Sequence, residues 1–89
     1  MEQKTVLAVC GSVTYAMKAK SVLGYRGISA YVMKAPTGLY SFGCNYSVKF
    51  KCPRPELAID LLRAASVKLG AVYVEEDGGW REIWKKEGR

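Results

Sequence analysis

The 89-residue chain contains no histidine. Histidine is the commonest base that activates cysteine and serine nucleophiles and a frequent zinc ligand, so its absence argues against both kinds of site. Cysteine is scarce too, with three residues and no C-x-x-C spacing, and no phosphate-binding glycine loop is present. We therefore expect no disulfide framework, no structural zinc site and no other bound cofactor.

Long hydrophobic runs are also missing. No apolar stretch approaches the ~20 residues of a membrane span, and the first residues of the chain lack a signal-peptide pattern. A hydrophobic content of 49% in a chain of this length is typical of one globular domain. We predict a cytoplasmic protein with reduced cysteines and no membrane partner.

Acidic residues are outnumbered, with eight Asp and Glu against fourteen Lys and Arg, which gives a net charge of +6. Such a balance permits an acidic protein partner, an anionic small ligand or nucleic acid, and by itself selects none of them.

Hydrophobic patterning predicts an α+β domain. Apolar runs or strict alternation predict strands at residues 5–10, 28–35, 45–52 and 71–74. Helical spacing predicts helices at residues 13–23, behind an N-cap at Ser12, and 55–69. The order β-α-β-β-α-β is that of the ferredoxin-like fold, with an antiparallel sheet of order 4-1-3-2 and both helices on one face.

Two segments make up the predicted organisation. Residues 1–77 form the domain, and residues 78–89 form a C-terminal amphipathic tail or short helix. Trp80, Ile83 and Trp84 would share one side of that helix at i, i+3 and i+4 spacing.

A nine-residue loop, residues 36–44, separates the second and third predicted strands and ends in Gly43-Cys44. Small domains rarely carry a connection of this length unless it has a function. In the predicted topology the first strand ends, at Cys10, beside the start of the third strand. Cys10, Cys44 and the start of the first helix should therefore lie close together, whereas Cys52 should lie at the opposite edge.

This arrangement would favour a sulfur anion, because a helix N-terminus carries partial positive charge and free N–H groups. Cys44 is the candidate carrier thiol. Cys10 is either a second thiol or a buried small hydrophobe, and Cys52 shares the parity of core residues. The predicted anion-binding positions are Gly11, Ser12 and Gly43, with Lys34 or Lys49 as sources of further charge.

The loop resembles that of a small bacterial and archaeal family of selenium/sulfur (Se/S) carrier protein-like domains. Pro36, Ser41, Gly43 and Cys44 carry the resemblance, which covers roughly residues 4–75, together with the Gly-Ser lead-in to the first helix. Where the family often has glycine after the cysteine, this chain has asparagine. The resemblance implies an accessory carrier rather than an enzyme. It implies that Cys44 holds sulfur or selenium as a persulfide-type adduct and passes it between donor and acceptor enzymes.

Two other functions fit the predicted fold. RNA-binding domains share its element order, but the open face of the third strand offers Ser47, Lys49 and Lys51 without an aromatic residue. Tyr31 and Tyr73 could contribute aromatic rings, but the characteristic stacking pattern is missing, so we do not expect a nucleic-acid partner. An interaction domain could use the open sheet face, with Tyr31 and Met33, to form a homodimer.

Overall fold

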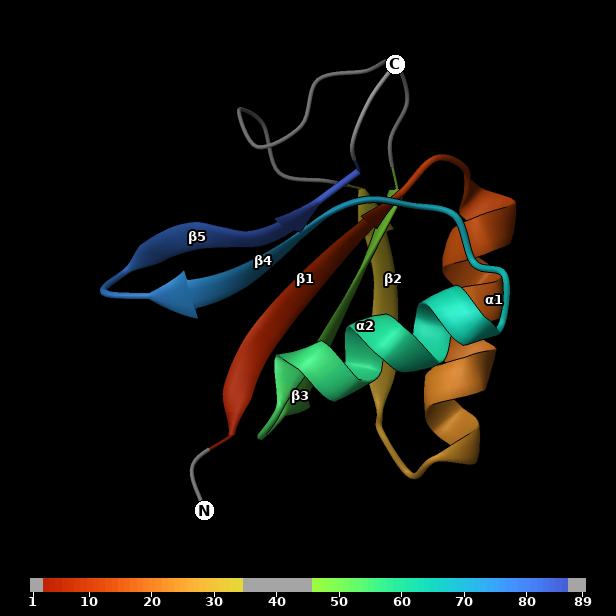
Figure 1. The fold of residues 1–89 in the computed structure, drawn as a ribbon, viewed down its shortest axis with the longest axis horizontal. Helices are drawn as coiled ribbons and strands as arrows, with labels where there is room; N and C mark the ends of the chain where they lie inside the picture. The colour runs from red at the N-terminus through yellow and green to blue at the C-terminus, as the bar shows by residue number, and fades with distance from the viewer. Residues whose placement is uncertain (1–2, 35–45, 87–89) are drawn as a thin grey trace.

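The computed structural model describes residues 3–34 and 46–86 of the chain. These residues form two helices and five strands (Figure 1). The elements in chain order are β1 (Lys4–Cys10), α1 (Val13–Tyr25), β2 (Ala30–Lys34), β3 (Tyr46–Cys52), α2 (Pro55–Ala64), β4 (Leu69–Glu76) and β5 (Gly79–Lys85). The four strands and two long helices predicted from the sequence are present, with their ends shifted by a few residues.

The described strands form one antiparallel sheet in the order β2-β3-β1-β4-β5. The α+β class is confirmed. The predicted four-stranded order 4-1-3-2 does not match this sheet, because a fifth strand, β5, lies at the outer edge of β4. The fifth strand places β4 inside the sheet, where it has hydrogen-bonded neighbours on both sides.

The predicted C-terminal helix is wrong, since residues 79–85 form β5. The sequence Asp77-Gly78 makes the tight turn before it, with φ values of 52° and 79° at the two residues. Two consecutive positive φ angles define the turn that matches the twist of an antiparallel hairpin. The free edge of β4 then offers backbone partners, and this pairing overrides the helical spacing of the tryptophans. Trp80 and Trp84 consequently pack into different hydrophobic clusters.

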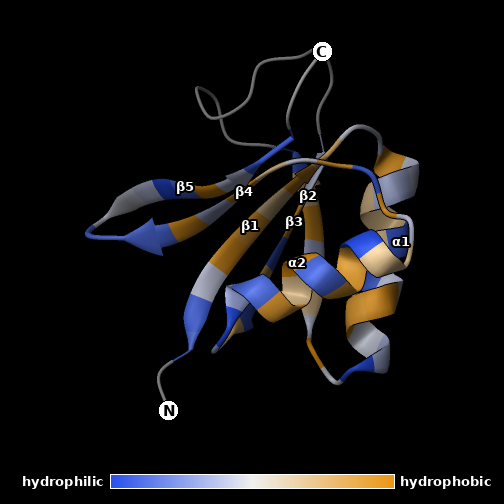
Figure 2. Ribbon diagram, viewed as in Figure 1, coloured by the Kyte–Doolittle hydropathy of each residue, from blue (hydrophilic) through white to orange (hydrophobic). Residues whose placement is uncertain are grey.

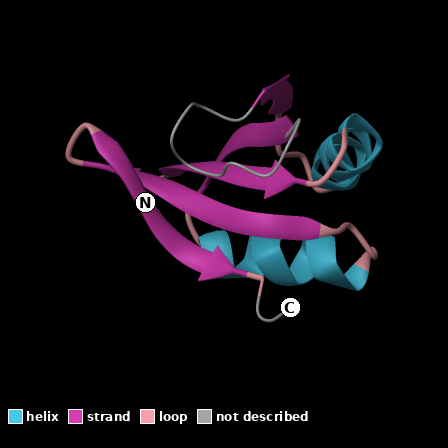
Figure 3. Ribbon diagram, turned by 90° about the horizontal axis from the view of Figure 1, so that it is seen from above, coloured by secondary structure: helices cyan, strands magenta, loops and turns pink. Residues whose placement is uncertain are grey.

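Both helices pack on one face of the sheet, where the main core lies. Figure 3 shows α1 nearly end-on and α2 side-on, so the two helices run in different directions. Ala16 and Ala19 on the inner face of α1 are fully buried, and their small side chains let the helix approach the strands closely. The largest fully buried side chains of this core are Val6, Leu23, Val48, Leu62 and Val72.

The helix-free face carries a second, smaller cluster. Leu7, Val9, Ala71 and Tyr73 are buried there, with Trp80 packed against them. The central strand β1 is therefore buried on both faces, as its continuous apolar sequence predicts, and Figure 2 shows hydrophobic residues along most of its length. Ser47 is also buried on this face and donates a hydrogen bond to the carbonyl oxygen of Met33 at 3.1 Å.

Helix α2 begins with Pro55 in its first turn, where a missing N–H costs nothing. It ends at Ala64, five residues before the predicted end at Leu69. Ser66 has a φ of 65°, in the left-handed region that stops a helix. Leu69 and Gly70 accordingly belong to β4, and Gly70 is not the helix cap.

Candidate functional site

The predicted site lies at the sheet edge where β1 ends and β3 begins. Cys10 at the end of β1 pairs with Tyr46, the first residue of β3, and on its other side with Leu69 of β4. Helix α1 starts three residues after Cys10. The predicted proximity of Cys10, the start of β3 and the N-terminus of α1 is thus confirmed.

Ser12 caps α1 as predicted. Its Oγ accepts a hydrogen bond from the backbone N–H of Tyr15 at 3.3 Å, and its carbonyl accepts one from Ala16 at 3.0 Å. The first turn of α1, which is described in full, holds no acidic side chain. No side-chain carboxylate of that turn therefore offsets the positive end of the helix dipole. Gly11 is exposed just ahead of the cap.

Cys10 is fully buried within the main core. Its Sγ lies 3.8 Å from the carbonyl oxygen of Ala8, to which it donates. Burial raises the pKa of the Cys10 thiol from 9.0 to about 12, because the apolar surroundings disfavour the thiolate. The interpretation of Cys10 as a second working thiol is therefore disfavoured, and its interpretation as a small core residue accounts for the structure.

Cys52 lies at the other end of the sheet, as predicted, since it pairs with Lys4 at the start of β1. It is buried, and its Sγ donates to the carbonyl oxygen of Arg54 at 3.2 Å. The register separates Cys10 from Cys52 by six residues of strand, or about 20 Å at ~3.3 Å per residue. The two thiols are far too distant to react with each other or to share a ligand.

Cys44 and Gly43 belong to residues 35–45, which lie outside the described residues. Their predicted roles as carrier thiol and anion-binding glycine stay predictions. Pro36 and Ser41, which carry part of the resemblance, fall in the same segment.

Positive charge is present near this edge. Lys34 pairs with Tyr46 and therefore lies at the edge, whereas Lys49 pairs with Leu7 and lies further along β3. Lys68, which the sequence interpretation missed, has its Nζ 6.0 Å from the ring centroid of Tyr15 in the first turn of α1. Its proximity could not be found from sequence, because residues 15 and 68 come together only when α2 folds back over the sheet.

A hollow of about 460 Å³ opens beside this edge and is lined in part by Lys68, Leu69 and Lys86. Arg63, Val67 and Trp84 also line it, with the guanidinium of Arg63 5.6 Å from the ring centroid of Trp84. In residues 3–34 and 46–86, no group of three or more His, Cys, Asp or Glu side chains is arranged to hold a metal ion. Neither described helix is long and apolar enough to cross a membrane.

Comparison with known families gives one finding. A family model described as "Putative Se/S carrier protein-like" matches residues 5–74. That range includes β1 apart from its first residue, every described element from α1 to α2 and most of β4, together with the segment that contains Cys44. No curated protein and no solved structure gives a significant match to the chain.

Proposed function

Because the chain belongs to the Se/S carrier protein-like family, we propose that it carries sulfur or selenium on the thiol of Cys44. In the proposed loading step, the Cys44 thiolate attacks the outer sulfur of a donor persulfide, R–S–SH. The new bond makes Cys44–S–SH, and the broken S–S bond releases the donor as R–S⁻. An acceptor thiolate then takes the outer sulfur in the same way and regenerates the Cys44 thiolate.

This exchange balances without an external oxidant or reductant, because one sulfur atom moves from thiol to thiol at each step. The same scheme applies to a donor of the type R–S–SeH. The protein then acts as a delivery module between two partner enzymes and needs no base of its own, which suits a chain without histidine.

The burial of the other two cysteines carries the assignment to Cys44. Cys10 and Cys52 both lie in the main core, so neither offers an accessible sulfur to a second protein. The Cys10 thiol is further disfavoured by its raised pKa. Of the three cysteines in the sequence, Cys44 is the one that remains as a candidate for exchange.

Electrostatics at the edge of the sheet support the same proposal. Tyr46, two residues after Cys44 in the chain, lies next to the end of β1 and to Lys34. The N-terminus of α1, whose first turn holds no acidic side chain, follows that end of β1. Lys68 lies close to the first turn of α1. A persulfide is anionic near neutral pH, so positive groups at this edge would stabilise the loaded form.

The test is to incubate the protein with glutathione persulfide and to measure the intact mass. We expect a gain of one sulfur atom that is lost again when a thiol acceptor is added. Cys44→Ser should abolish the gain, while Cys10→Ala and Cys52→Ser should keep it. A sulfur adduct that persists in Cys44→Ser, or that never forms on the unmodified chain, would refute the proposal.

A further inference from the structure

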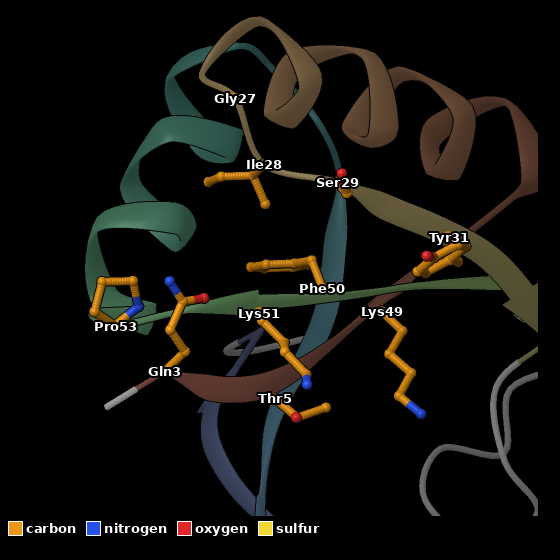
Figure 4. Close-up of a pocket in the computed structure, with 10 residues that line it drawn as sticks. All are labelled: Gln3, Thr5, Gly27, Ile28, Ser29, Tyr31, Lys49, Phe50, Lys51 and Pro53. Carbon is orange, nitrogen blue, oxygen red and sulfur yellow. The ribbon is translucent and has the colours of Figure 1, made fainter. Parts of the chain in front are cut away.

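A groove opens where β2 begins and β3 ends, at the end of β3 away from Cys10. Its volume is about 600 Å³, and small-molecule sites span about 300–1,000 Å³. Residues from the α1–β2 connection, β2, the end of β3 and the start of β1 line it (Figure 4). Neither the family match nor the proposed carrier chemistry gives this groove a role.

The groove follows from how the chain enters β2. Gly27, with a φ of 79°, turns the chain at the end of α1, and the N–H of Ile28 bonds back to the carbonyl of Leu23 at 3.0 Å. Pairing of β2 with β3 then begins only at Ala30, opposite Phe50. Strand β3 continues to residue 52 without a partner residue in β2. A backbone notch is left between the two segments.

The rim of the notch combines an aromatic ring with two cations. Tyr31 has a side chain with 68% of its surface exposed, and it pairs across the strands with Lys49. Lys51 lies two residues further along β3, on the same face, at a backbone distance of about 6.6 Å. Figure 4 shows both lysine side chains extending to the side of Thr5, away from the helices.

The lining has no opposite charge. None of the described residues around the groove is acidic, and the chain as a whole carries a net charge of +6. Ile28 adds apolar surface between the strands, next to Phe50, which is itself buried in the core, and Ser29 and Thr5 add hydroxyl groups. Two cations beside an exposed aromatic ring, with no acidic residue among the described lining, form a surface suited to a phosphate attached to a planar ring.

We propose that this groove binds a nucleotide unit, with the base stacked on Tyr31 and the phosphate held by Lys49 and Lys51. The unit is either a free nucleotide or part of a single-stranded RNA, since both present the same ring and phosphate. The sequence interpretation set nucleic acid aside because β3 carries no exposed aromatic residue. The structure places the exposed Tyr31, on the neighbouring edge strand, directly opposite Lys49.

A second copy of the chain is a poorer occupant. A twofold contact through this groove would bring Lys49 and Lys51 close to the same lysines of the other copy, with no acidic residue of the described lining to offset them. Like charges placed together disfavour such a contact. The predicted homodimer through the open sheet face stays a prediction, and this groove does not support it.

The test measures fluorescence anisotropy of a labelled uridine oligonucleotide with the full-length protein. We expect Tyr31→Ala to weaken binding by at least about fivefold, the lower bound for losing one base stack, and Tyr31→Phe to retain it. In Lys49→Gln/Lys51→Gln, the slope of log affinity against log salt should fall by about 0.7, the value for the one phosphate that the two lysines hold. All three positions are on the surface, and circular dichroism checks that the variants fold.

Lys18→Gln/Lys85→Gln is the matched control, because it removes the same charge from exposed positions on α1 and β5 that do not line the groove. The control should keep the original salt slope. Competition with uridine monophosphate separates the two sources. If uridine monophosphate displaces the labelled oligonucleotide at equal nucleotide concentration, the groove is assigned to a free nucleotide. If only longer strands displace it, the groove is assigned to single-stranded RNA.

The inference would be overturned if neither the oligonucleotide nor uridine monophosphate bound at low ionic strength. It would also be overturned if Lys49→Gln/Lys51→Gln and Lys18→Gln/Lys85→Gln lost the same affinity, or if Tyr31→Ala bound as tightly as the unmodified chain. Equal displacement by an acidic peptide of matched charge would also contradict it, since a peptide carboxylate needs no base stack. Cys44→Ser should bind as the unmodified chain does, so failure of the carrier proposal would leave this result unchanged.

Discussion

The buried thiol of Cys10 makes the stability of the protein depend on pH in a way that the structure fixes in sign. The side chain of Cys10 is fully buried, as is that of Val9, the preceding residue in the chain. Burial raises the pKa of the Cys10 thiol from 9.0 to about 12. The unfolded chain releases this proton near the ordinary pKa, whereas the folded chain retains it. The stabilisation from the neutral thiol is therefore complete below pH 9 and is lost as pH rises towards 12.

Between these two pKa values the free energy of unfolding falls by about 1.4 kcal/mol for each pH unit. By pH 10 the loss from this one group is about 1.4 kcal/mol. The variant Cys10→Ala has no thiol proton at this position, so its stability does not show this loss at high pH. We expect the variant to be less stable near pH 7 by about 1 kcal/mol, the typical cost of a single substitution. The gap should close by about pH 10.

Urea denaturation followed by tryptophan fluorescence measures both chains across this range. Titration of the lysines, tyrosines and other cysteines affects both chains equally and cancels in the difference. Val9→Ala is the matched control, because it truncates a neighbouring buried side chain that has no titratable group. Its gap should stay constant with pH. If the difference in unfolding free energy between Cys10→Ala and the unmodified chain also stayed constant with pH, the inference that the thiol is buried and neutral would be refuted.

Two further predictions concern the fold itself. Gly78→Ala should destabilise the protein by about 1 kcal/mol or more, because Gly78 has a φ of 79° in the β4–β5 turn. Gly24 lies inside α1, and no atom lies near the methyl group that alanine would add, so Gly24→Ala should stabilise the protein by about 0.5–1 kcal/mol. Thermal melting distinguishes the two, and equal shifts would contradict the turn assignment. Leu62→Ala on the buried face of α2 should cost about 2–5 kcal/mol. Leu57→Ala on the exposed face should cost no more than about 0.5 kcal/mol, and similar losses would show that the assigned core face is wrong.

The two proposals use opposite ends of β3. Tyr46 is the first residue of this strand, at the edge where carriage is proposed, and Lys51 is near its end, in the groove. Five residues of strand separate them, or about 17 Å. A nucleotide unit in the groove therefore need not block access of a partner thiol to the other edge, which is why the two tests can be read independently.

Much of the fold was predictable, because its signals are local. The alternation of residues 46–52 determines which face of β3 is buried, and the continuous apolar run of β1 determines that it lies in the centre of the sheet. The N-cap at Ser12 and the start of α2 at Pro55 are likewise predicted by the local sequence. The order of these elements was sufficient to place Cys10 beside the start of β3 and Cys52 at the opposite end.

The C-terminal segment shows where local signals fail. Trp80, Ile83 and Trp84 have helical spacing, and the competing strand depends on whether β4 has a free edge. That edge exists only after the sheet has formed, so no local pattern reveals it. The Asp77-Gly78 pair was the available signal for a hairpin, and its two positive φ angles are what bring β5 back onto β4.

The sequence alone determined the family, the α+β class and the position of the carrier candidate in the segment before β3, because these depend on residue types and their order. Only the tertiary structure decided that the thiols of Cys10 and Cys52 are buried and that Tyr31 lies beside Lys49. Burial of Cys10 requires β1 to pack into the main core between β3 and β4, and the pairing of Tyr31 with Lys49 requires two strands that are distant in sequence. Contacts of this kind depend on register and packing, which no single segment of the chain specifies.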